Sequence, residues 1–191
     1  MDKIFGQRDL LLYFSHLLSL NNIPYLLTGS FAVSYYGYPR ATHDIDFIIE
    51  IVDEKSTTIV PVIHSLKKDF TFASNVDQAS ITTPTFFNLY HGVTGIKIDF
   101  WVVDKKEFFE KYSRRQIMTI DKQKISLVSP EDLILNKLKW CKELFSERHL
   151  RDCIGIWKIQ NKRLDIKYLE QKVKEYNIST LYEKIKISPY E

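Results

Sequence analysis

Apolar positions near the N-terminus recur at the spacing of one helix face, which predicts a helix over residues 4–20. The apolar stripe consists of Leu10, Leu11, Phe14, Leu17 and Leu18. A short apolar run then predicts a buried strand over residues 24–28, which Gly29 ends. A short helix that ends near Gly37 should follow, and after it a second strand over residues 45–51.

The middle of the chain has a weaker pattern. Residues 53–70 are predicted as an amphipathic helix, within which Pro61 marks a kink or a later start. Residues 70–87 have no clear period. Alternating apolar residues predict two strands, over residues 86–91 and 96–103, joined as a hairpin by a glycine-containing turn.

The last part of the chain is dominated by helical patterns. A short helix over residues 106–115 and a hairpin over residues 117–128 come first. Ser129 is then a typical N-cap, with a proline at the first helical position and acids in the first turn. The predicted helices that follow cover residues 129–145, 147–160, 165–176 and 179–187.

The change from strands to consecutive helices near Ser129 predicts the architecture. We expect an α/β (α+β) fold in which a small mixed β-sheet with helices is followed by a helical C-terminal part. The sheet core should cover residues 1–128, and residues 129–191 should pack on it. The length of 191 residues and the hydrophobic content of 45% suit such a compact unit.

Composition adds expectations about the protein's environment. The N-terminus lacks the order of a signal peptide, and no apolar run has the length of a membrane span, so we expect a cytoplasmic protein with no membrane partner. The two cysteines, Cys141 and Cys153, have no metal-site spacing and fall in apolar helical patterns. They are predicted to be small core residues in a reducing compartment.

The net charge of +3 is unevenly distributed. Residues 1–104 hold 7 Lys and Arg against 11 Asp and Glu, a net charge of −4, and residues 105–191 hold 20 against 13, a net charge of +7. The basic half could attract RNA or a nucleotide. The alternative is that its lysines form ordinary solvated helix faces, because mixed Lys and Glu are common there.

Two polar features lie at neighbouring strand ends. Gly29-Ser30 stands where the first strand meets a helix, so backbone N–H groups and a hydroxyl point to one place, as in phosphate sites. Asp44 and Asp46 are two residues apart at the start of a strand and therefore share a face. Their repulsion favours a hard divalent cation such as Mg²⁺ or Mn²⁺ between them.

A third carboxylate lies further along the chain. In the predicted strand over residues 96–103, Lys97 and Asp99 alternate with the apolar Ile96 and Ile98. Asp99 is therefore predicted on a polar strand face, where it could complete the metal site. A solvated Asp at a sheet edge is the alternative for Asp99, and a helix N-cap is an alternative role for Ser30.

Gly29-Ser30, followed after thirteen residues by Asp44-Ile45-Asp46, resembles the signature of the nucleotidyltransferase superfamily with the DNA polymerase beta fold. The lead-in to the carboxylates, with Arg40 and Thr42, is similar to the bacterial AbiEii-like toxin branch. The resemblance implies that Arg40 and Thr42 either contact nucleotide or only order the loop.

The helical part carries a second resemblance. The stretch from Ser129 to Trp140 and the one from Ser146 to Asp152 are similar to uncharacterised bacterial nucleotidyltransferase-like proteins and to the AbiEii-like branch. The resemblance implies that Lys137 neutralises a triphosphate and that Asp152 completes the site. The alternative for Asp152 is a surface ion pair.

These resemblances imply an enzyme that transfers a nucleoside monophosphate from an NTP to an acceptor hydroxyl and releases pyrophosphate. Asp44, Asp46 and Asp99 would be catalytic and would bind metal, while Gly29 and Ser30 would hold phosphates. The resemblance names tRNA or other RNA and a cognate antitoxin as candidate partners. The alternatives are a catalytically silent module that binds nucleotide or RNA, and one half of a toxin–antitoxin pair.

Overall fold

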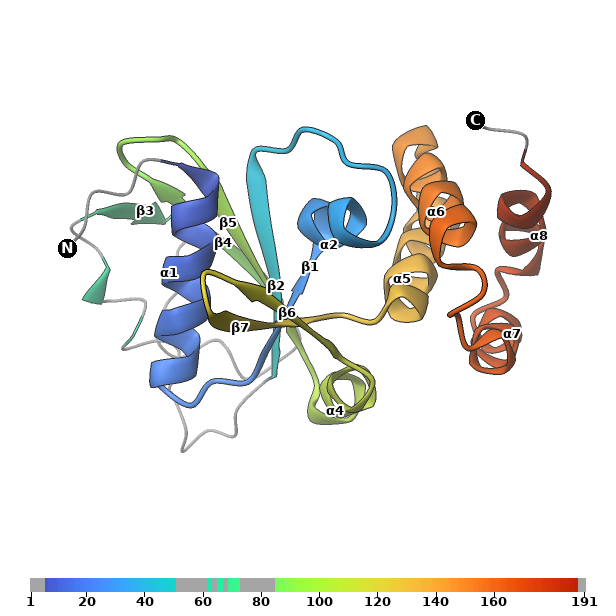
Figure 1. The fold of residues 1–191 in the computed structure, drawn as a ribbon, viewed down its shortest axis with the longest axis horizontal. Coiled ribbons are helices and arrows are strands. Elements are labelled where there is room, and N and C mark those ends of the chain that lie inside the picture. Colours follow the sequence, from blue (N-terminus) through green and yellow to red (C-terminus); the bar gives the residue numbers. More distant parts are fainter. Residues whose placement is uncertain (1–5, 51–61, 63–64, 67–68, 73–84, 189–191) are drawn as a thin grey trace.

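The computed structural model describes residues 6–50, 62, 65–66, 69–72 and 85–188. Most of the helix predicted over residues 53–70 and most of the segment 70–87 lie outside these residues. Figure 1 shows a central sheet with helices around it and a group of helices at the C-terminal end. The expected α/β architecture, with a helical C-terminal part beside a mixed sheet, is therefore confirmed.

The sheet is mixed, and its strands stand in the order β3-β4-β5-β2-β1-β7-β6. Two parallel pairs, β2 with β5 and β1 with β7, join strands that are distant in sequence. The other neighbours pair antiparallel. The strands are β1 (Tyr25–Thr28), β2 (Asp44–Glu50), β3 (Phe70–Phe72), β4 (Thr85–His91), β5 (Lys97–Val103), β6 (Gln116–Ile120) and β7 (Gln123–Leu127).

Helices cover the sheet and form the C-terminal part. In the view of Figure 1, α1 lies in front of the sheet, α4 lies below it, and α2 lies between the sheet and the C-terminal helices. The helices are α1 (Gln7–Leu20), α2 (Gly29–Tyr36), α4 (Lys105–Ser113), α5 (Pro130–Glu143), α6 (Glu147–Gln160), α7 (Ile166–Glu175) and α8 (Ser179–Ile187). None of the helices among the described residues is long and apolar enough to cross a membrane.

The central strands have two unlike faces because side chains alternate along them. On one face, the rings of Phe47 and Phe100 stack with their centroids 5.6 Å apart. The ring centroid of Phe14, from α1, lies 5.9 Å from that of Phe100 on the same face. This face is the main core. On the other face, Ile48 packs with Phe108 of α4 in a smaller apolar cluster. The polar positions of β2 and β5 share that second face.

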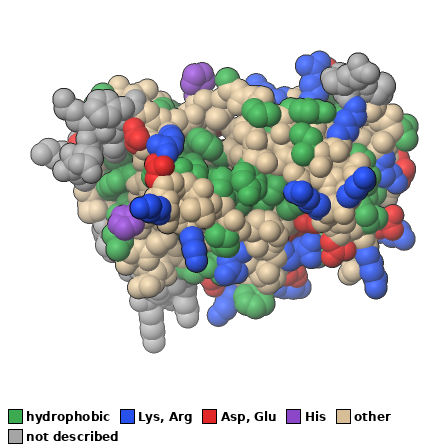
Figure 2. Space-filling view, in the orientation of Figure 1, with side chains coloured by type: hydrophobic (Ala, Val, Ile, Leu, Met, Phe, Trp, Pro, Cys, Tyr) green, Lys and Arg blue, Asp and Glu red, His purple; other side chains and the backbone are tan. Residues whose placement is uncertain are grey.

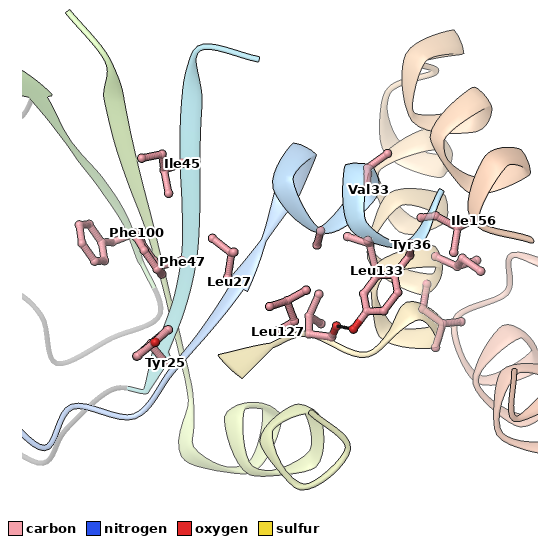
Figure 3. Packing of buried hydrophobic residues seen from close by; sticks show 14 of the residues in the cluster. Tyr25, Leu27, Val33, Tyr36, Ile45, Phe47, Phe100, Leu127, Leu133 and Ile156 are labelled. Carbon is pink, nitrogen blue, oxygen red and sulfur yellow. Dashed lines mark hydrogen bonds between the residues drawn. The ribbon is translucent and has the colours of Figure 1, made fainter. Parts of the chain in front are cut away.

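Helix α2 connects the sheet to the helical part. Figure 3 shows Val33 and Tyr36 of α2 among Leu127, Leu133 and Ile156, which come from β7, α5 and α6. The hydroxyl of Tyr36 donates a hydrogen bond of 2.9 Å to the carbonyl oxygen of Val128. The helices after residue 129 therefore pack against the core through α2.

Backbone contact holds the end of α2 close to α6. A Cβ at Gly37 would lie 3.0 Å from the backbone nitrogen of Ile156, and a Cβ at Gly155 would lie 2.8 Å from Cδ2 of Tyr38. Both positions therefore need the small size of glycine. This contact fixes the loop that follows α2 against the helical part.

Most predicted elements are present, with small differences at their ends. Helix α6 and helix α8 have the predicted bounds, and Ser129 is the N-cap of α5, where its hydroxyl accepts from the N–H of Asp132. One expectation and one alternative were wrong. The helix expected to reach Phe70 has ended before it, because Phe70 pairs with His91 in the sheet. Ser30 is not an N-cap, since α2 begins at Gly29 with Thr28 as its N-cap.

Candidate functional site

Strand pairing brings two of the predicted carboxylates together. In the parallel pair of β2 and β5, Asp46 lies opposite Asp99, and Asp44 lies opposite Lys97. Neighbouring strands are about 4.8 Å apart, so side chains at matched positions on one face are adjacent. All four residues lie on the sheet face opposite the main core.

Gly29 lies directly against Asp46. Its φ is +62°, and a Cβ built there would lie 1.9 Å from the Oδ2 atom of Asp46. The position therefore requires glycine both for its backbone conformation and for its space. As a result, the first residue of α2 and the Asp46 carboxylate are in contact.

The hydroxyls of Ser30 and Thr42 hold Asp44. Ser30 Oγ donates to Thr42 Oγ1 at 2.5 Å and lies 3.3 Å from Oδ1 of Asp44. Thr42 Oγ1 in turn donates to the same carboxylate oxygen. Thr42 thus orders the entrance of β2, as one of the two expected roles requires.

The carboxylates differ in how readily they ionise. Burial, followed by the negative charges of Asp44 and Asp99, raises the pKa of Asp46 to about 6. Burial also raises the pKa of Asp99, against the opposing effect of Lys97. Burial alone would raise the pKa of Asp44, but the Thr42 hydrogen bond and the charge of Lys97 outweigh it and lower that pKa. Full ionisation of this group therefore has a cost that a bound cation would reduce.

The side chain of Lys97 already places a positive charge among these acids. The ammonium of Lys97 is 2.7 Å from Oδ2 of Asp99, and the charges of Asp44 and Asp46 also raise its pKa. The other oxygen of Asp99, Oδ1, is buried and has no hydrogen-bond partner within the described part of the chain. The donor set therefore fits a hard cation, which prefers carboxylate oxygens. Among the described residues, however, no group of three Asp, Glu, His or Cys side chains is arranged so that it could bind a metal ion.

The other predicted residues form an adjacent ion-pair chain. Asp152 accepts from Arg40 at 2.9 Å and 3.1 Å, and its Oδ2 is also 2.9 Å from Nζ of Lys137. Asp152 and Lys137 are both buried. Because Asp152 is occupied by two cations, it lies in an ion-pair chain rather than with the three carboxylates on the sheet. Burial would raise its pKa, but Arg40 and Lys137 lower it.

A cavity of about 470 Å³ connects the two groups. Its lining includes Gly29, Asp46 and Lys137, two residues of β5, and other residues of α4 and α5. The positive charge of Lys137 also acts on Asp46, where it opposes the rise in pKa. The cavity therefore joins the N-terminus of α2, a carboxylate and a buried lysine in one space.

Sequence reasoning missed the aromatic part of this cavity. Trp101 lies two residues after Asp99 on the same strand face, and its indole N–H donates to Oδ1 of Asp46 at 3.5 Å. Trp140 of α5 meets Trp101 with ring centroids 5.7 Å apart. Alternation along β5 could have placed Trp101 beside Asp99, but no local signal joins Trp140 to it.

The basic residues of the helical part are mixed with acids. Figure 2 shows Lys, Arg, Asp and Glu side chains interspersed over that part of the visible face. Lys172 pairs with Glu175 at 3.0 Å, and Lys186 pairs with Glu183 at 2.6 Å. This arrangement fits the alternative of solvated helix faces, and RNA binding by the basic half stays a prediction.

The raised pKa of Asp46 predicts a pH dependence of stability in metal-free protein. An unfolded Asp loses its proton near pH 4, whereas folded Asp46 keeps it to about pH 6. The folded state therefore binds more protons in this window, and the free energy of unfolding contributed by Asp46 falls as the pH rises. Asp46→Asn removes that loss, on the order of 2 kcal/mol.

Urea denaturation in EDTA at pH 4 and pH 7 checks this expectation. The stability of Asp46→Asn relative to the unmodified protein should increase between the two pH values. A difference that stays constant with pH would contradict it.

No protein-family model and no curated protein matches the sequence. Solved structures do match. An antigenic nucleotidyltransferase-like protein from Paracoccidioides brasiliensis is 19% identical, with a TM-score of 0.54 over 91% of this chain and 90% of the other. The antibiotic-resistance factor ANT(2'')-Ia is 13% identical, with a TM-score of 0.59 over 92% and 94%. The lincosamide antibiotic adenylyltransferase LnuA is 16% identical, with a TM-score of 0.57 over 82% and 99%.

These structural neighbours are nucleotidyltransferase-like proteins, and at such low identity the likeness shows a shared fold. It covers most of this chain, including the helical part. The AbiEii-like branch of the resemblance stays a prediction.

Proposed function

We propose that the chain is a nucleotidyltransferase that moves a nucleoside monophosphate from an NTP to an acceptor hydroxyl and releases pyrophosphate. The observation that carries this proposal is the pairing of β2 with β5, which sets Asp46 opposite Asp99 beside the first residue of α2. A phosphate-binding helix end and a carboxylate pair are the two parts that this transfer needs. The shared fold with nucleotidyltransferases supports the same reaction class.

The N-terminus of α2 would hold the leaving phosphates. Its free backbone N–H groups and positive helix dipole attract anions. Lys137 lines the same cavity and would add a positive charge, although in the structure it pairs with Asp152. Arg40 reaches this region only through Asp152, so its expected role here is to position that acid.

Asp46 and Asp99 would hold Mg²⁺, with Asp44 as a third acid next to them. The ion, when bound, supplies positive charge against the phosphate oxygens as negative charge develops on them. Ser30 and Thr42 would orient Asp44 through the hydrogen bonds already described.

Asp99 would also take the acceptor's proton. The acceptor oxygen forms a bond to the α-phosphorus while the bond from that phosphorus to the bridging oxygen of pyrophosphate breaks. The hydroxyl proton would pass to a carboxylate oxygen of Asp99. Burial of Asp99 keeps competing water away from the proton acceptor.

The class of acceptor is proposed from two directions. ANT(2'')-Ia has been solved with adenylyl-2''-tobramycin and LnuA with lincomycin, so small hydroxylated molecules are one acceptor class to test here. The resemblance to the toxin branch proposes tRNA as the other. A cognate antitoxin is proposed as a partner only together with tRNA as the acceptor.

A transfer assay tests the proposal. Purified protein is incubated with Mg²⁺ and each of the four labelled NTPs, together with total RNA, tRNA, an aminoglycoside or lincomycin. We expect label to move to one acceptor class with release of pyrophosphate. The Asp46→Asn protein should give no transfer and serves as the control.

Calorimetry supplies the second measurement of this prediction. At least one NTP should bind in the presence of Mg²⁺, and chelation should weaken the binding. If none of the four NTPs binds at millimolar concentration, the proposed function is wrong.

A further inference from the structure

The cavity beside Asp46 continues along the sheet to a pair of tryptophans that the proposed chemistry does not use. In the strand register, Ile48 lies opposite Trp101, two residues further along β2 from the Asp46 position on the same face. Trp101 and Trp140 both line the cavity. The phosphate-binding end and the aromatic end therefore belong to one continuous space.

The tryptophan pair has room for a further ring. Trp101 and Trp140 meet edge to face with an interplanar angle of 68°, a contact that leaves a ring face available for stacking. The Trp140 side chain is 46% exposed, which is high for so large an aromatic residue. Phe86 also packs against Trp101, with the ring centroids 4.5 Å apart, and supports that indole.

The cavity that the pair lines contains both basic and acidic side chains. Three lysines line the cavity: Lys111, Lys137 and Lys139. Three acids also line it: Glu107, which pairs with Lys111 at 2.5 Å, Glu143, and Asp46, which belongs to the carboxylate site. A ligand that is flat at one end and negatively charged at the other would place its flat group at the tryptophans and its charge at Lys137 and the N-terminus of α2.

We propose that the Trp101–Trp140 pair stacks a nucleobase while the phosphates of the same or a neighbouring nucleotide lie at Gly29 and Lys137. This inference rests on the proposed function and deepens it, because it assigns the aromatic end of the cavity to a base. The base comes from the donor NTP or from an acceptor nucleotide. Trp101 links the aromatic end to the carboxylates, since its indole N–H donates to Asp46.

Tryptophan fluorescence, excited at 295 nm, tests the proposal. Adenosine, uridine, guanosine and cytidine, the four NTPs and inorganic triphosphate are titrated separately. We expect a nucleoside and its NTP to quench the emission and inorganic triphosphate to leave it nearly unchanged. Trp140→Leu should weaken the nucleoside affinity by about fivefold or more, because each stacked base is worth about 1–3 kcal/mol.

Trp157→Leu is the matched control. Trp157 lies on α6, where its ring centroid is 5.6 Å from that of Tyr182, and it does not line the cavity. Its replacement should leave nucleoside affinity unchanged. Because about half of Trp140 is exposed, Trp140→Leu should also keep the melting temperature of the unmodified protein.

Kinetics of the transfer assay separate the two sources of the base. If the base belongs to the donor, Trp140→Leu raises KM for the NTP, and if it belongs to an acceptor nucleotide, it raises KM for the acceptor. If transfer proceeds with both KM values unchanged and no nucleoside binds, the tryptophan proposal is wrong while the proposed function stands. If nucleosides bind through Trp140 but no NTP supports transfer, the proposed function fails and the base site stands.

Discussion

Gly29→Ala should reduce nucleotidyl transfer by about a hundredfold or more, because a displacement of about 1 Å in a catalytic group can cost that much. The new Cβ would lie 1.9 Å from Oδ2 of Asp46, so the carboxylate must move away from its place opposite Asp99. Alanine at a φ of +62° adds about 1–2 kcal/mol of backbone strain. Activity and thermal stability of the purified variant are the measurements.

Gly95→Ala separates the two effects. Gly95 also has a positive φ, +67°, but no atom lies within 4 Å of its Cβ position. This variant should lose similar stability and keep its activity. Equal activity in both variants would mean that contact between Gly29 and Asp46 does not position the carboxylate.

Asp99→Asn should lower the rate of transfer by about a hundredfold to ten-thousandfold while the fold remains and NTP affinity falls much less than the rate. The amide occupies the same buried place but can neither take the acceptor's proton nor supply a charged oxygen to a metal. Single-turnover rates and calorimetry with an NTP measure the two quantities separately. Full activity in Asp99→Asn would exclude Asp99 from the chemistry.

Asp152→Asn is the contrasting variant. Asp152 lies between Arg40 and Lys137, so its replacement leaves the buried ammonium of Lys137 without its counter-charge. We expect a loss of about 3 kcal/mol in the free energy of unfolding. A stable Asp152→Asn protein that binds NTP normally but lacks transfer would instead support the role in completing the site that the toxin-branch resemblance gives Asp152.

Local chemistry explains what could be predicted from the sequence. Ser129 and Pro130 specify the start of α5 through a hydroxyl acceptor and a fixed φ, so that boundary needed no tertiary information. The alternation in β5 likewise placed Lys97 and Asp99 on one face. In the hairpin predicted over residues 117–128, Asp121 and Lys122 form the turn with positive φ, a conformation that Asp adopts more readily than Lys.

Other features of the site could not be predicted from the sequence, because they depend on contacts between distant segments. Asp46 lies opposite Asp99 because β2 pairs with β5 in this register, which a residue pattern does not specify. Trp140 reaches Trp101 only because α5 packs over the open sheet face. The preference of Asp152 for Arg40 similarly depends on how α6 approaches the loop after α2.

The parallel pairing of β2 with β5 also has a kinetic consequence. Asp46 and Asp99 are about fifty residues apart in sequence, and β1 pairs with β7 across about a hundred, so the sheet depends on long-range loop closure. Such topologies fold slowly compared with locally connected ones. The residues of the signature in the first fifty positions would therefore meet no partner carboxylate early in folding. Nucleotide would stabilise only the completed sheet, shifting the folding equilibrium by mass action without guiding the first steps.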